Sequence, residues 1–225
     1  HALAERGERL RVVEAQLLER EAPPEEVQAA VDAAGHHEAP GRYKVRLKIA
    51  DAVLTEEVEV RKDPRSTGSA ADIEALVAFQ QQTRERLEEI QAAAIRVRKV
   101  RDQVKATTAL VGDRPEGKAV VEAGKALGDK LTAWEETVVQ PKQKTFQDVI
   151  NFRNMLNDQF GFLIDIGGEA DAAPTQGMRE RLADLEKEWA ERQKVLGDLL
   201  DRDVPAFNAA FKEAGLGAIV VPGGR

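Results

Sequence analysis

Adjacent glutamates recur along the sequence and are the first groups that could do acid–base chemistry. A glycosidase needs two carboxylates that face each other across a cleft, one of them with a raised pKa. Neighbouring residues on a helix point about 100° apart, so an adjacent pair does not make such a facing pair. We therefore expect the doublets to lie on a solvated surface. They are Glu25-Glu26, Glu56-Glu57, Glu88-Glu89 and Glu135-Glu136.

Histidine and cysteine are too scarce for most metal or nucleophile chemistry. The absence of cysteine excludes disulfides, thiolate zinc sites and cysteine nucleophiles. His36 and His37 could both bind a metal, but two ligands do not make a zinc site, so we expect a loop role for them. A metal site of the bundle type needs Glu-x-x-His, which cannot occur after the last histidine, His37. The sequence thus predicts no catalytic residue, no metal and no cofactor.

Two further patterns favour structural roles over binding. The spacing Gly-x-x-x-x-Gly-Lys occurs at Gly112, Gly117 and Lys118, but alanine follows where a phosphate loop has Ser or Thr, and a helix precedes it. Trp134 and Trp189 could stack on a sugar, yet both fall on inward helical positions, so we expect them in the core.

A set of polar residues gathers around Pro141, which interrupts the helical pattern. The set consists of Gln140, Asp148, Asn151, Arg153 and Asn154. As structural groups they would form hydrogen bonds across a helical bundle or hold the kink at the proline. As functional groups they would form an interaction surface, and they are the candidate site that the sequence offers.

The charge balance argues against a nucleic-acid partner. Lys and Arg number 33 and Asp and Glu number 40, which gives a net charge of -7. A duplex-binding domain is normally basic, with Lys and Arg on one face. The densest basic run is expected to be the solvated side of one helix, with contact to an acidic partner as the alternative. It contains Arg96, Arg98, Lys99, Arg101 and Lys105.

The composition predicts a helical globular protein. With 42% apolar but only 4% aromatic residues, the core is built from Leu, Val, Ile and Ala, which favours packed helices. The sequence has no signal peptide and no run of eighteen apolar residues, so we expect no membrane insertion. It begins with His1 rather than Met, and we expect a fragment or a processed protein.

Residues 1–65 predict an N-terminal α/β segment. Periodicity predicts short helices over residues 2–20 and 25–34. One face of the first helix would carry Leu3, Leu10, Val13 and Leu17. Residues 42–61 alternate apolar with charged residues and predict a β-hairpin. Its apolar face must pack on the helices or belong to a sheet with an exposed edge that needs a partner.

Residues 66–225 predict a helical bundle domain, which makes the chain mainly α. We expect an up-down bundle of four long helical segments, over residues 70–111, 116–140, 142–165 and 175–202. A short helix from Pro205 and an apolar tail at 218–222 follow. The third segment is expected to bury Phe146, Val149, Ile150, Leu156, Phe160 and Leu163. The first carries a heptad seam: Ile73, Leu76, Gln80, Thr83, Leu87, Ile90, Ala94, Val97, Arg101 and Val104.

Several motifs also resemble a known protein family. Residues 39–47, Ala-Pro-Gly-Arg-Tyr-Lys-Val-Arg-Leu, resemble a strand that ends an Ig-like or fibronectin-like sandwich, and residues 58–65 resemble the exit from it. The helical part adds Gln140-Pro141-Lys142-Gln143-Lys144-Thr145, Gln147-Asp148, Asn151-Phe152, Asp203-Val204-Pro205-Ala206-Phe207-Asn208 and Ile219-Val220-Val221-Pro222. Together these motifs resemble the C-terminal region of bacterial proteins with sortilin-type BNR-repeat β-propellers, commonly labelled glycosyl hydrolases.

The resemblance implies a non-catalytic C-terminal accessory module for docking, stability or oligomerisation. Any glycan-directed chemistry would belong to an upstream propeller, and the module would be extracellular or periplasmic. Its partner would be that propeller, another protein chain or a second copy. Residues 1–38 depart from the family pattern, which has the earlier sandwich strands here, so the resemblance implies an incomplete or remodelled β-domain.

The heptad seam supports an alternative that has no link to glycans. The chain would then be a self-contained helical-bundle adaptor or a coiled-coil regulatory protein, located in the cytoplasm. Such a protein is expected to self-associate stably in solution.

Overall fold

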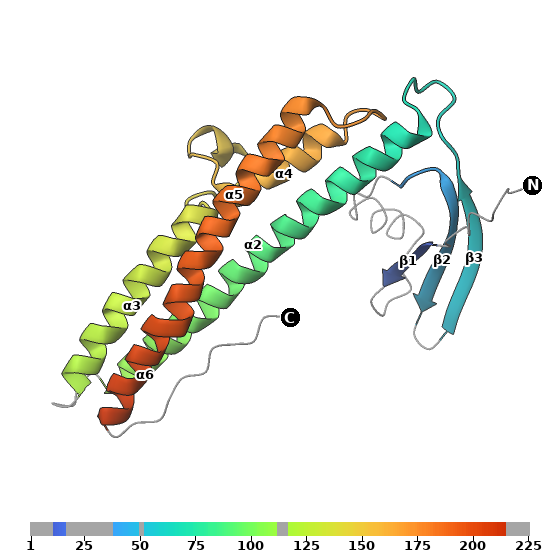
Figure 1. The fold of residues 1–225 in the computed structure, drawn as a ribbon. Coiled ribbons are helices and arrows are strands. Elements are labelled where there is room, and N and C mark those ends of the chain that lie inside the picture. The colour runs from blue at the N-terminus through green and yellow to red at the C-terminus, as the bar shows by residue number, and fades with distance from the viewer. Residues whose placement is uncertain (1–10, 17–37, 50–51, 112–116, 215–225) are drawn as a thin grey trace, which may run out of the picture. The chain divides into compact units, whose positions relative to one another are not determined.

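The computed structural model describes residues 11–16, 38–49, 52–111 and 117–214 (Figure 1). The chain divides into two compact units. The first consists of the described residues up to Phe79 together with 168–174, and the second consists of the remaining described residues from Gln80 onward. The mainly α fold, a helical bundle preceded by a β-hairpin, is confirmed.

The first unit contains a sheet of three strands, β1 (Arg11–Gln16), β2 (Gly41–Ile49) and β3 (Ala52–Val60), in the order β1-β2-β3. β2 and β3 are antiparallel and pair Tyr43 with Val58, which confirms the predicted hairpin. β1 runs parallel to β2. Residues directly opposite each other on neighbouring strands have their side chains on the same face of the sheet, so the register decides which side chains lie together.

The helix predicted over residues 2–20 is wrong for residues 11–16, which form β1. This segment contains two adjacent valines, and six residues are too few for periodicity to separate a helix from a strand. Pairing with β2 supplies the hydrogen bonds that the strand needs, and this tertiary contact decides the outcome. The rest of that predicted helix and the helix at 25–34 lie outside the described residues.

The segment between β3 and the first helix is held by local hydrogen bonds. Asp63 accepts a hydrogen bond from the backbone N–H of Arg65 at 2.8 Å and pairs with its guanidinium. Ser69 and Asp72 form a reciprocal cap, in which each side chain accepts a hydrogen bond from the other residue's backbone N–H. The predicted start of the helix at residue 70 follows from this cap.

Helix α2 (Ala70–Val111) has the predicted bounds and 42 residues. The predicted seam is correct, because its members lie buried with two exceptions, Leu87 and Arg101, which are half-buried. The seam also contains Gln80 and Thr83, two polar residues that are almost fully buried.

The third predicted segment is only partly helical. Helix α3 (Gly117–Val138) is followed by a loop that contains a short 3-10 turn, η1 (Phe146–Ile150), and then by helix α4 (Leu156–Gly167). Leu156, Phe160 and Leu163 are buried as predicted, but Val149 and Ile150 are exposed, which corrects their assignment to the core. Pro141 and the turn-forming residues around it end the helical run.

Helix α5 (Gln176–Asp198) continues through a π-helical turn, η2 (Leu199–Asp203), into helix α6 (Val204–Glu213). Thr175 caps α5 by accepting a hydrogen bond from the backbone N–H of Met178 at 3.2 Å. Pro205 lies in the first turn of α6 as predicted, and Phe207 and Phe211 are buried with their rings stacked. The tail predicted at 218–222 lies outside the described residues.

The helices of the second unit form three legs (Figure 1). One leg is the α2 part of the unit, the second is α3 followed by α4, and the third is α5 with α6. A Cβ built on Gly124 of α3 would lie 2.3 Å from Thr108 Cγ2 on α2 and 3.1 Å from Phe207 Cε2 on α6. A Cβ on Gly167, at the end of α4, would lie 3.5 Å from atoms of Gln80 and Met178. The second leg is interrupted by the loop that connects the end of α3 to the start of α4.

Candidate functional site

The polar residues predicted around Pro141 all lie at the interruption of the second leg. We call residues 139–155 the α3–α4 loop. In Figure 1 it appears in yellow, curled out beside the helices that it connects. The structure thus brings Gln140, Asp148, Asn151, Arg153 and Asn154 into one connection, although they do not converge on a single point.

Asp148 is the anchor of this loop. One carboxylate oxygen accepts hydrogen bonds from the backbone N–H groups of Lys144 at 2.6 Å and Thr145 at 2.8 Å. These bonds favour the ionised form and hold the pKa of Asp148 below its ordinary value of 3.8. The same residue, through its backbone carbonyl, accepts the N–H groups of Asn151 and Phe152 at 3.0 Å each. Asp148 therefore fixes the backbone on both sides of η1.

Side-chain amides join the two ends of the loop. Gln140 Nε2 donates to the carbonyl of Arg153 at 3.2 Å, and Gln143 Nε2 donates to Asn154 Oδ1 at 3.3 Å. Gln159 of α4 donates to the carbonyl of Asn154 at 3.2 Å. Two of these hydrogen bonds lie within the α3–α4 loop, and the third joins the loop to α4. The candidate residues therefore stabilise the loop and its junction with α4.

The braced loop exposes two apolar residues, its tip, and three basic residues. Ile150 is 84% exposed and Val149 is 46% exposed, both on η1. The loop contains three basic residues, which are all exposed, and one acid, Asp148, whose carboxylate is engaged by the backbone. The basic residues are Lys142, Lys144 and Arg153. In a chain with a net charge of -7, this surface is locally positive.

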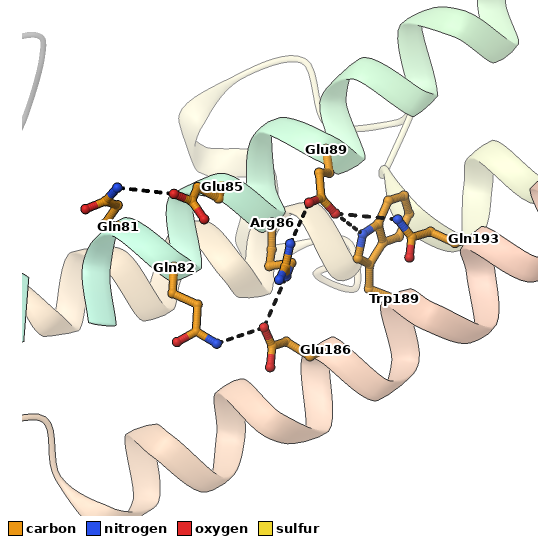
Figure 2. A network of polar contacts seen from close by, with 8 residues as sticks. All are labelled: Gln81, Gln82, Glu85, Arg86, Glu89, Glu186, Trp189 and Gln193. Atoms are coloured by element: carbon orange, nitrogen blue, oxygen red, sulfur yellow. Dashed lines mark hydrogen bonds and ion pairs between the residues drawn. The ribbon is translucent and has the colours of Figure 1, made fainter. Parts of the chain in front are cut away.

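A network of polar side chains joins α2 and α5 (Figure 2). Glu186 of α5 accepts hydrogen bonds from Gln82 at 3.0 Å and from Arg86 Nε at 3.1 Å. Glu89 of α2 accepts from Arg86 Nη1 at 2.5 Å and from the indole of Trp189 at 2.9 Å. The hydrogen bond to Glu186 is the main reason that the pKa of Arg86 is raised. Arg86 thus bridges the carboxylates of Glu89 and Glu186, and the network forms a contact between the two helices.

A second cluster centres on Glu135 of α3, which is 5% exposed. Its two carboxylate oxygens accept from Arg98 Nε and Arg101 Nη1 of α2, at 2.5 Å each, and Arg101 also donates to Thr132 Oγ1 at 3.2 Å. This result corrects two expectations, since Glu135 is not on a solvated surface and the run from Arg96 to Lys105 is not purely a solvated face. Arg101 occupies a seam position of α2, and this position was the signal in the sequence that its side chain contacts another helix.

Other residues singled out in the sequence take structural positions. Trp134 and Trp189 are both 3% exposed, and the indole of Trp134 donates to the carbonyl of Arg192 at 2.9 Å. Gly117 begins α3 against Val111, while residues 112–116 lie outside the described part. His36 and His37 lie outside it as well.

The described residues contain no group of three or more acidic or histidine side chains that could hold a metal ion. Of the acidic doublets, Glu56 and Glu57 occupy successive positions of β3 and therefore point to opposite faces of the sheet. The arrangement that stands out is instead a surface feature, the α3–α4 loop with its exposed Ile150.

No protein-family model matches the chain, and no curated protein and no solved structure matches it either. Within the described ranges, none of the helices combines the length and the apolar character needed to cross a membrane.

Proposed function

We propose that the chain is a non-catalytic interaction module that binds a protein partner through the α3–α4 loop. The observation that supports this proposal is the combination of an 84% exposed Ile150 with a backbone held in place by Asp148. Compact loops of this kind are frequently functional, and a braced loop loses little conformational entropy when it binds.

The partner that fits this loop is a protein with an apolar depression bordered by carboxylates. Ile150 and Val149 supply the apolar contact, and the exposed Lys142, Lys144 and Arg153 of the same loop supply positive charge. Apolar side chains that fill a pocket give most of the affinity of an interface, and charges at the rim set its orientation and association rate.

A quantitative comparison of purified complexes tests the proposal. The full chain is purified from its own cells as wild type, as Ile150→Asp and as Val195→Asp, and the bound proteins are quantified. Val195 is the matched control, because it is an apolar residue of α5 that is 47% exposed. We expect a protein that is lost with Ile150→Asp and retained with Val195→Asp. Equal recovery of every bound protein in all three samples would contradict the proposal.

At the level of the whole protein, we propose a C-terminal accessory module of a sortilin-like BNR-repeat propeller protein, extracellular or periplasmic. The support is the motif series and the order of its parts, in which a β-hairpin is followed by Asp63-Pro64-Arg65 and then by the helices. Sequencing the gene upstream of His1 tests this, since propeller-blade repeats and a signal peptide are expected there. A start codon directly before Ala2 would contradict it.

The alternative, a coiled-coil regulator that self-associates, has less support. The α2 seam that would form such a coiled coil is already buried within the chain itself from Gln80 to Val104. Sedimentation equilibrium tests the alternative, because a coiled-coil regulator requires a stable oligomer and a strict monomer at micromolar concentration would contradict it.

A further inference from the structure

A second surface, independent of the α3–α4 loop, lies at the outer edge of β3. In the order β1-β2-β3, the central strand β2 pairs on both sides, whereas β3 pairs only with β2 among the described strands. Alternate residues of β3 therefore direct their N–H and C=O groups away from the sheet. β3 is nine residues long and contains no Pro, so every residue keeps its backbone N–H, and its only charged residues are three glutamates.

Both faces of β3 carry apolar residues and glutamates. The register with β2 places Leu54, Glu56 and Val58 on one face, and Val53, Glu57 and Glu59 on the other. Leu54 is 60% exposed and Val58 is 41% exposed. A strand added at this edge would meet apolar side chains and at least one carboxylate on each face.

The charges of the hairpin are divided by strand. β2 contains four basic residues and no acid, whereas β3 contains three glutamates and no basic residue. Across the pair, Lys44 Nζ lies 3.7 Å from Glu57 Oε1, and Arg42 is in register with Glu59, whose carboxylate accepts hydrogen bonds from the Arg61 side chain. β2 thus demonstrates the kind of strand that β3 accepts, one in which basic and apolar residues alternate.

We propose that the free edge of β3 binds an extended strand of a protein partner in which basic and apolar residues alternate. The hydrogen bonds come from the backbone of β3, and the choice of partner comes from its carboxylates. A second copy of β3 fits this edge poorly, because each copy carries three glutamates and no basic residue to pair with them. The surface is therefore directed at a different sequence.

A fluorescent peptide with the sequence of residues 41–49, Gly-Arg-Tyr-Lys-Val-Arg-Leu-Lys-Ile, is the probe for this edge. Binding to the full chain is measured by anisotropy, beside a peptide in which Glu replaces each basic residue. We expect the acidic peptide to bind at least about tenfold more weakly. Equal binding of the two peptides, or no binding of the basic one, would overturn the proposal.

Addition at the edge must be distinguished from replacement of β2. A replacement for β2 needs hydrogen bonds along both of its edges, whereas an added strand needs only one. Two peptides, each N-methylated at alternate residues along one edge, separate these cases. We expect one of the two to retain binding. Loss of binding with both would show exchange of β2 and would overturn the proposal.

Variants of the protein complete the test. Glu57→Gln with Glu59→Gln should remove the preference for the basic peptide, while the control pair Glu88→Gln and Glu191→Gln, at exposed sites on α2 and α5, should keep it. Hydrogen exchange of the β3 amides should show new protection at alternate residues when the peptide binds. Protection of those amides in the free protein would mean that the chain covers this edge itself, which contradicts the proposal.

Discussion

The carboxylate of Glu135 shows how a single charge is held inside the bundle. It is bound by Arg98 and Arg101, whose side chains are 47% and 29% exposed, so solvent screens the pair in part. Glu135→Gln removes the negative charge, so the guanidinium groups of Arg98 and Arg101 lose their anionic partner. We expect the free energy of unfolding to fall by about 1–3 kcal/mol, measured by urea denaturation.

Glu136, the exposed neighbour, is the control for this change. Glu136→Gln should change the free energy of unfolding by no more than about 0.5 kcal/mol. If both substitutions lowered stability equally, the cluster around Glu135 would have no special role.

Two glycines of α3 should respond to alanine with opposite signs. A Cβ on Gly124 would lie 2.3 Å from Thr108 Cγ2 and 3.1 Å from Phe207 Cε2, whereas a Cβ on Gly128 meets nothing within 4 Å. Gly124→Ala should destabilise by about 1–3 kcal/mol because the core is overpacked. Gly128→Ala should stabilise by up to about 1 kcal/mol through helix propensity. Thermal unfolding measures the change in stability of both variants. A change of the same sign in both would contradict this packing.

At the scale of the element, the seam of α2 contains a polar residue whose removal should stabilise the fold. Gln80 is 3% exposed, and its Oε1 has no hydrogen-bond partner. Gln80→Met keeps the volume and removes the buried acceptor, so the free energy of unfolding should rise by about 1–2 kcal/mol. Gln81→Met, at the exposed neighbouring site, should leave it nearly unchanged. Destabilisation by Gln80→Met in urea denaturation would mean that the amide is needed.

The α3–α4 loop should depend on pH through Asp148. Its pKa is lower in the folded loop than the ordinary 3.8, so ionisation stabilises the loop above about pH 4, and this contribution is lost as the pH falls through the folded pKa. By NMR, the amide shifts of Lys144 and Thr145 should titrate with a midpoint below 3.8. Asp148→Asn should abolish that titration. A midpoint at or above 3.8 in the wild type would show that the carboxylate does not hold these amides.

The elements could be predicted from the sequence where one pattern was long and uniform. The seam of α2 extends over many turns, and the predicted bounds of the helix, residues 70 and 111, match the structure. β1 was missed because a segment of six residues fits both the helical and the strand period. Only its pairing with β2 decides in favour of the strand. The helical segment predicted over residues 142–165 was too long, because the apolar Val149 and Ile150 were assigned to the core. Exposed apolar residues and buried ones look alike in sequence.

At the scale of the whole molecule, the candidate site was predicted in position, and the sequence left two roles open for it, bracing the chain at Pro141 and forming an interaction surface. The residues around Pro141 do lie together, yet Gln140 and Asp148 bind the loop's own backbone. The surface that the loop presents depends on Ile150, which the sequence had assigned to the core. Which polar groups face inward is decided by the backbone path of the loop, and no periodicity reports that path.

The most direct test of an interaction module is a photo-crosslinking residue placed at position 150 of the full chain in its own cells, with a second placed at Val195 as the control. A docking tip predicts one dominant protein adduct from position 150, absent from position 195 and lost when Lys142→Glu and Lys144→Glu reverse the surrounding charge. The same adducts from both positions, or none from position 150, would contradict the role of the α3–α4 loop.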